Sequence, residues 1–246
     1  MEAATSNPSS KRIALVSGGN KGIGLETCRQ LASKGFKVLL TARNEARGLE
    51  AVEGVRRSGA DVVFHQLDVT DPDSVARLAD FVRDQFGKLD ILINNAGISG
   101  VDRDPVLFAQ VQEQVESMDN FNSEELKKEF DDIDNLTEKR LEELLDLFLE
   151  DFNANLIEAH GWPTGGSSAY KVAKAALNAY TRILAKRFPA MRINCLTPGF
   201  VKSDMSMHMG ELTLEEGASN LVKVALLPDD GPNGAYFDRD GVASFV

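Results

Sequence analysis

Short apolar runs alternate with amphipathic stretches of helical length along the first hundred residues, and this alternation constrains the fold most. The pattern predicts strands at residues 12–17, 37–42, 62–67 and 89–93, and helices at 25–34, 45–57 and from Pro72 onward, with Asp71 as N-cap. Strands that alternate with helices of about 10–15 residues indicate a parallel sheet with helices on both faces. The predicted fold class is therefore α/β, a doubly wound parallel sheet in three layers, αβα.

The rest of the chain predicts a single domain with one departure from this rhythm. Residues 1–10 are polar and rich in Ser, and we expect a disordered tail, with the domain over 11–246. Residues 98–167 are expected to form an atypical helical insertion, because apolar side chains recur at helical spacing over 107–118 and 141–156. The earlier rhythm then returns with a helix at 168–187, a strand at 191–197, a helix at 213–227 and a strand at 234–237.

Charge and composition exclude several classes of partner. The segment from Glu113 to Asp151 holds 15 acidic and 4 basic residues, so it carries the chain's whole net charge of −11. A nearly neutral remainder argues against nucleic acid or an anionic membrane as partner. No apolar run approaches the roughly 18 residues that span a bilayer, and no secretory signal opens the chain. Cys28 and Cys195 stand in no metal-binding spacing, which favours free thiols in the cytoplasm and no metal site.

Glycines join the first predicted strand to the first predicted helix. Gly18, Gly22 and Gly24 form a GxxxGxG pattern that also contains Asn20, Lys21 and Ile23. Such a loop lets the backbone approach a pyrophosphate, which then lies at the helix N-terminus. In this position the glycines predict a Rossmann-like dinucleotide-binding unit rather than an ordinary turn.

The end of the second strand indicates which dinucleotide binds. An acidic residue there would hold the ribose 2′-hydroxyl of NAD, but this chain has Arg43, and Lys21 adds a second cation in the glycine loop. Two cations without an acid favour the 2′-phosphate, so we expect NADP(H) as the cofactor. The alternative is that Arg43 is a solvated loop residue.

Tyr170 and Lys174 open the helix predicted at 168–187. At i and i+4 they share one helix face. An ammonium near a phenol stabilises the phenolate, so we expect Lys174 to lower the pKa of Tyr170 toward the range of proton transfer. A solvated surface pair is the alternative.

Taken together, these residues resemble the short-chain dehydrogenase/reductase family. The glycine loop, Asn94–Gly97 (NNAG), the YxxxK pair and Pro198-Gly199 occur in the family's order. The resemblance implies that Tyr170 exchanges a proton with a carbonyl or alcohol, and that Lys174 holds the nicotinamide ribose and tunes Tyr170. It implies further cofactor contacts from Asp68 and Val69 beside the adenine, from Asn95, Ala96 and Gly97, from Pro198 and Gly199, and from Val201 and Ser203 near the carboxamide.

A closer similarity is to the plant-type monomeric branch of this family, that of the neomenthol dehydrogenases, menthone reductases and salutaridine reductases. It is carried by the insertion before Tyr170 and by Gly161-Trp162-Pro163 and Leu226–Gly231. This similarity implies a monomer that acts on a small hydrophobic ketone or alcohol of terpenoid or alkaloid type.

Two elements of the family pattern are missing between residues 98 and 169. One is a fifth strand that ends in the serine contacting the substrate carbonyl, and the other is a helix with an asparagine that holds a relay water. Ser167 and Ser168 lie too close to Tyr170, where a serine most often caps the coming helix. We therefore interpret the chain as internally deleted near Asp119-Asn120. Three hypotheses stay open: an active carbonyl reductase, an NADP(H)-binding remnant without turnover, or a chain that does not fold stably.

Overall fold

The computed structural model describes residues 11–98, 121–132, 134–165 and 167–244. The chain divides into two compact units. The first comprises Met1–Gly97 and Phe200–Leu226, and the second Ile98–Gly199 and Leu227–Val246. That residues 11–246 form one domain stays a prediction.

A parallel sheet of four strands forms the centre of the first unit. The strands are β1 (Ile13–Val16), β2 (Lys37–Ala42), β3 (Val62–Gln66) and β4 (Ile91–Ile93), in the order β3-β2-β1-β4. They are connected by helices α1 (Gly22–Ser33), α2 (Glu45–Arg56) and α3 (Pro72–Phe86), and α8 (Leu214–Ala225) joins the unit from the later part of the chain. The predicted α/β class is thereby confirmed.

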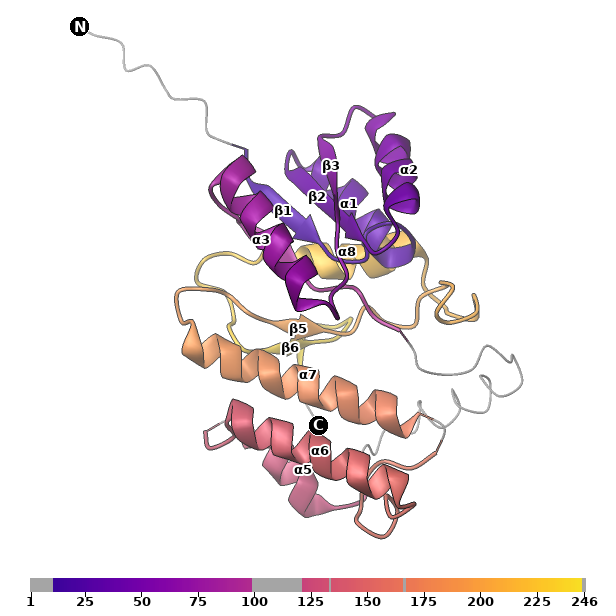
Figure 1. Ribbon diagram of the computed structural model, residues 1–246, viewed down its shortest axis with the longest axis vertical. Helices are drawn as coiled ribbons and strands as arrows, with labels where there is room; N and C mark the ends of the chain where they lie inside the picture. Colours follow the sequence, from indigo (N-terminus) through magenta and orange to yellow (C-terminus); the bar gives the residue numbers. More distant parts are fainter. Residues whose placement is uncertain (1–10, 99–120, 133, 166, 245–246) are drawn as a thin grey trace, which may run out of the picture. The chain divides into compact units, whose positions relative to one another are not determined.

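Side chains that alternate along these strands form two hydrophobic cores, one on each face of the sheet. Ala14, Val16, Val38 and Leu40 pack with residues of α1, α2 and α8. Leu15 and Leu39, which point to the opposite face because side chains alternate along a strand, pack with Leu78 and Val82 of α3. Helices therefore cover both faces, with α3 on one side of the strands and α2 on the other (Figure 1). The three-layer prediction is correct for this unit.

The helix ends in this unit follow local chemistry. Asp71 accepts a hydrogen bond from the backbone N–H of Asp73, Pro72 opens α3, and Gly87 ends it in the left-handed region with φ +67°. Helix α8 begins at a capping box, in which Thr213 accepts from the N–H of Glu216 and the Glu216 carboxylate accepts from the N–H of Thr213. The predicted N-cap at Asp71 is confirmed.

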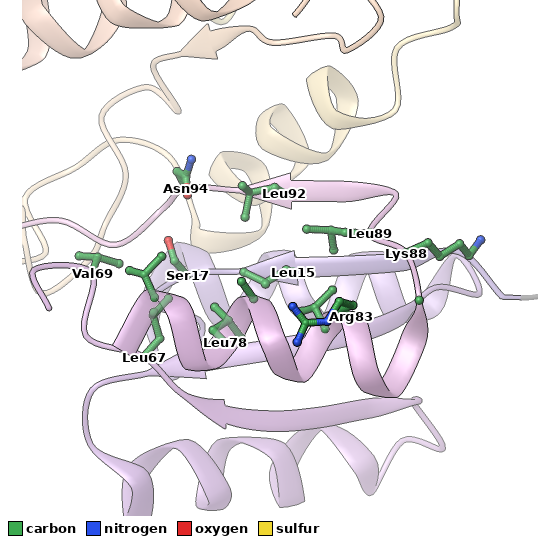
Figure 2. A pocket seen from close by; sticks show the side chains of 14 residues that line it. Leu15, Ser17, Leu67, Val69, Leu78, Arg83, Lys88, Leu89, Leu92 and Asn94 are labelled. Carbon is green, nitrogen blue, oxygen red and sulfur yellow. The ribbon is translucent and has the colours of Figure 1, made fainter. Parts of the chain in front are cut away.

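An apolar cavity of about 590 Å³ lies between β4 and α3. Leu89 and Leu92 lie on one side of it and Leu67 and Leu78 on the other (Figure 2). Within the described residues β4 pairs only with β1, and Leu92 is 53% exposed. The outer edge of this sheet thus keeps an open apolar face.

The second unit combines three helices with a small sheet. Helices α5 (Glu124–Asp131), α6 (Glu138–Asn153) and α7 (Ser168–Arg187) pack around the fully buried Trp162. Strands β5 (Cys195–Leu196), β6 (Tyr236–Phe237) and β7 (Val242–Ala243) form the sheet, with β5 parallel and β7 antiparallel to β6. The helical insertion is confirmed in its described part.

Several predicted boundaries differ from the structure. Helix α1 begins at Gly22 rather than at Leu25, so it includes the last glycines of the loop. Strand β5 covers only two of the seven residues predicted at 191–197, and α5 and β7 were not predicted. The helix expected over 107–118, the deletion point at Asp119-Asn120 and the tail at 1–10 lie outside the described residues.

Candidate functional site

The glycine loop folds tightly against the segment that follows β4. Gly18 and Gly22 have φ values of +65° and +57°, which favour glycine. A Cβ at Gly18 would lie 3.0 Å from the Cα of Ala96, and one at Gly24 would lie 2.5 Å from the carbonyl oxygen of Gly18 and overlap the amide of Asn95. The loop therefore requires glycine at Gly18 and Gly24, and it leaves the N-terminus of α1 bare of side chains at these points.

Asn95 locks this loop in place. Its Nδ2 donates hydrogen bonds to the carbonyl oxygens of Ser17, at 3.0 Å, and Gly18, at 3.3 Å. The Ser17 hydroxyl in turn accepts from the backbone N–H groups of Asn95 and Ala96, both at 3.0 Å. The side-chain amide of Asn95 thus binds the backbone of the glycine loop. Ser17 positions the segment after β4, a role that was not predicted from the sequence. Its signal is a small hydroxyl residue directly after an apolar strand.

Arg43 follows β2 at the point predicted to select the cofactor. The residue is exposed, and its charge contributes to lowering the pKa of the Asp68 carboxyl. The larger causes of that lowered pKa are hydrogen bonds from the backbone N–H and the hydroxyl of Thr70, at 3.0 and 2.8 Å. Val69 is 49% exposed. The structure therefore presents a cation and an open apolar side chain on neighbouring strand ends.

Lys21 is engaged within the protein. Its Nζ lies 2.6 Å from Oδ2 of Asp204, a residue that the sequence analysis did not single out. Asn20 and Ile23, which lie close to Lys21 in the sequence, are half-buried. Gly97, which follows β4, is exposed.

Val201 and Ser203 belong to the first unit, in a turn stabilised by a buried serine. Ser206 donates its hydroxyl hydrogen to the carbonyl of Val201 at 2.6 Å and accepts from the N–H of Ser203 at 2.9 Å. Met207 and His208 next in the chain have φ values of +47° and +61°. This turn determines where Ser203 and Asp204 lie.

Tyr170 and Lys174 lie one turn apart on α7, in the second unit. The Lys174 ammonium is 5.4 Å from the centroid of the Tyr170 ring. Burial raises the pKa of Tyr170, and desolvation lowers the pKa of Lys174 although part of this residue stays exposed. The expected lowering of the Tyr170 pKa is therefore wrong for this structure, because the ammonium lies over the ring and desolvation of the hydroxyl dominates.

The remaining predicted positions follow β5 and precede α7. Pro198 and Gly199 follow β5 after Thr197, and Gly199 has a left-handed backbone conformation with φ +85°. Ser167 occupies the N-cap position of α7, but its side chain makes no capping hydrogen bond. The predicted position of the N-cap is therefore correct, but the predicted capping hydrogen bond is absent. The Ser167 hydroxyl is buried and has no hydrogen-bond partner within the described residues.

Other kinds of site receive no support in the described part of the chain. It contains no group of three or more His, Cys, Asp or Glu side chains that could hold a metal ion. Nor does it contain a helix that is long and apolar enough to cross a membrane. Both cysteines are free thiols, and burial raises the pKa of each.

Comparisons with known proteins identify the family of this chain. A family model described as short chain dehydrogenase matches residues 12–130. Short-chain dehydrogenase/reductase 1 of Saponaria officinalis is 40% identical and is covered, like this chain, over 100% of its length. The (+)-neomenthol dehydrogenase of Arabidopsis thaliana is 40% identical over 95% of this chain and 98% of that protein. The structure of salutaridine reductase from Papaver somniferum matches with a TM-score of 0.81 and 38% identity, covering 92% of this chain and 99% of that one.

The Saponaria comparison also bears on the predicted deletion. It extends over 302 residues, whereas this chain has 246, so 56 of its positions have no counterpart here. The deletion point near Asp119-Asn120 stays a prediction. The glycine loop, the NNAG clamp and the YxxxK pair, with these relatives, place the chain in the short-chain dehydrogenase/reductase family, whose members bind a nicotinamide cofactor.

Proposed function

We propose that this chain is an NADPH-dependent carbonyl reductase or alcohol dehydrogenase for a hydrophobic ketone or alcohol of terpenoid or alkaloid type. The observation that carries the proposal is the glycine loop held by Asn95 at the start of α1, with the exposed Arg43 at the end of β2. The relatives that act on such compounds by name, neomenthol dehydrogenase and salutaridine reductase, support the substrate class. A monomer in the cytoplasm is part of the proposal, and the two free thiols support the compartment.

The residues present fit NADP(H). Gly22, the first residue of α1, has open space where a Cβ would lie, and the first turn of α1 carries no acidic residue that would repel a phosphate. Arg43 and Lys21 would hold the 2′-phosphate, and Val69 would lie against the adenine. Pro198, Gly199, Val201 and Ser203 would line the nicotinamide end.

Proton transfer falls to Tyr170. When bound, NADPH supplies the hydride that the carbonyl carbon accepts. Because burial raises the pKa of Tyr170, its hydroxyl holds a proton at neutral pH and can donate it to the carbonyl oxygen. Lys174, whose ammonium lies 5.4 Å from the centroid of the Tyr170 ring, would hold the nicotinamide ribose.

The test is substrate-dependent loss of NADPH absorbance with a panel of terpenoid and alkaloid ketones. Tyr170→Phe should reduce turnover by about 10²–10⁴-fold, the usual contribution of a general acid. Tyr180→Phe is the matched control, because Tyr180 lies on the same helix and its hydroxyl pairs with Glu138 at 3.2 Å. Equal activity in the two variants would exclude Tyr170 as the proton donor.

A second candidate is an NADP(H)-binding protein without reductase activity. The sequence favours it, because the family's substrate-contacting serine and the strand that ends in it are missing between residues 98 and 169. This alternative predicts saturable NADPH binding by fluorescence titration with no turnover of any ketone in the panel. Turnover that disappears in Tyr170→Phe would reject it.

A further inference from the structure

The cation of the glycine loop, Lys21, is paired with a carboxylate of the protein itself. Asp204 Oδ2 lies 2.6 Å from Lys21 Nζ, across 183 positions of sequence, and both residues belong to the first unit. Their side chains are 59% and 56% exposed, so an ion from solution can reach either one. Lys21 immediately precedes α1, where the cofactor's phosphates are expected.

Asp204 is presented by a well-defined turn rather than by a loose loop. The buried Ser206 ties the carbonyl of Val201 and the N–H of Ser203 together, and the N–H of Lys202 donates to the carbonyl of Leu212 at 2.8 Å. His208 approaches the other carboxylate oxygen, with Nε2 3.6 Å from Oδ1. The carboxylate is therefore held close to Lys21 by backbone that its neighbours determine.

This placement has a consequence for a dianionic ligand. A carboxylate against Lys21 neutralises one of the two cations that would attract a 2′-phosphate. NADH lacks that phosphate, so Asp204 opposes its binding far less. Arg43 stays exposed at the end of β2 as the second cation.

We propose that Asp204 sets the preference between NADPH and NADH by competing with the 2′-phosphate for Lys21. The inference rests on the proposed function, since it takes Lys21 as a ligand of that phosphate. Because the pair is exposed, its effect is modest, about two- to fivefold in the dissociation constant.

The experiment measures dissociation constants of the full chain for NADPH and NADH by fluorescence titration. Asp204→Asn should tighten NADPH by about two- to fivefold and leave NADH within error. Glu211→Gln is the matched control, because it removes the same charge from an exposed side chain in the same stretch of the first unit. It should leave the dissociation constants for NADPH and NADH unchanged. This result would distinguish an effect of the Lys21–Asp204 ion pair from an effect of the protein's net charge.

A double-mutant cycle tests whether Asp204 acts through Lys21. In a Lys21→Met background, Asp204→Asn should no longer change NADPH affinity. In the otherwise unchanged chain, Asp204→Glu keeps the carboxylate and should bind NADPH as tightly as the parent does. Weaker or unchanged NADPH binding in Asp204→Asn, or an equal gain for NADH, would overturn the inference while leaving the proposed function standing. A parent chain that binds neither cofactor would overturn both.

Discussion

The indole nitrogen of Trp162 donates a 2.8 Å hydrogen bond to the carboxylate of Asp151, and His160 Nδ1 lies 2.8 Å from the same oxygen. Trp162 is fully buried and Asp151 is 5% exposed, so a charged group lies inside an otherwise apolar cluster. The bond ties the chain segment before α7 to α6, and α7 carries Tyr170. The packing of the insertion therefore bears directly on the residue proposed to transfer the proton.

Replacing Trp162 with Phe should destabilise the protein by about 2–4 kcal/mol, because a hydrogen bond to a charged acceptor is lost and a void is left. Urea unfolding followed by circular dichroism measures this change. Leu149→Ala on α6 is the control. Leu149 is 54% exposed, so the change should stay within about 0.5 kcal/mol. Equal effects in the two variants would show that the indole hydrogen bond contributes nothing.

Asp151 should make stability depend on acidic pH. Burial alone would raise the pKa of this carboxyl, but the hydrogen bonds from His160 and Trp162 outweigh burial and hold the pKa below its usual value. A lowered folded pKa means that the carboxylate stabilises the fold above about pH 4, the value in unfolded chains, and that this stabilisation is lost as pH falls through the folded pKa. The difference in unfolding free energy between the parent and Asp151→Asn should therefore shrink below pH 4. A difference that grows there would refute the assignment.

Gly24 and Gly54 should respond oppositely to alanine. A Cβ at Gly24 would overlap the Asn95 amide, so Gly24→Ala should weaken NADPH binding more than tenfold and cost about 1–3 kcal/mol of stability. Nothing lies within 4 Å of a Cβ at Gly54, which is exposed within α2, so Gly54→Ala should stabilise the protein by about 0.5–1 kcal/mol. Thermal melting and NADPH titration of both variants check the pair, and unaltered binding in Gly24→Ala would contradict the proposed role of the glycine loop in cofactor binding.

Two N-caps allow a similar contrast. Thr213 forms a complete capping box, so Thr213→Ala should cost about 1 kcal/mol. Ser167 makes no capping bond, and its buried hydroxyl has no partner in the described part of the chain, so Ser167→Ala should be neutral or stabilising by up to about 1 kcal/mol. Denaturant midpoints measure both. A loss at Ser167 as large as that at Thr213 would restore the capping role expected from the sequence.

Much of the architecture could be predicted because local signals and burial agree. The bounds of β2 and α7 match the prediction residue for residue, since each has a continuous hydrophobic pattern and clear ends. Helix α5 escaped prediction because its sequence is mostly charged. It forms on a Ser123 cap, on Phe130 buried in the aromatic cluster, and on an ion pair between Asp131 and Arg182, which lies 51 positions away. Contacts at such separations have no signature in a local window.

The sequence by itself determined the order of the strands and helices in the first unit, the glycine loop and the cation after β2, because each depends on neighbours a few residues apart. Only the tertiary structure decided how those groups are used. The amide of Asn95 holds the backbone of Ser17 and Gly18, and Lys21 is paired with Asp204. Both contacts join residues far apart in the chain, and they form only because folding brings distant segments of the first unit together.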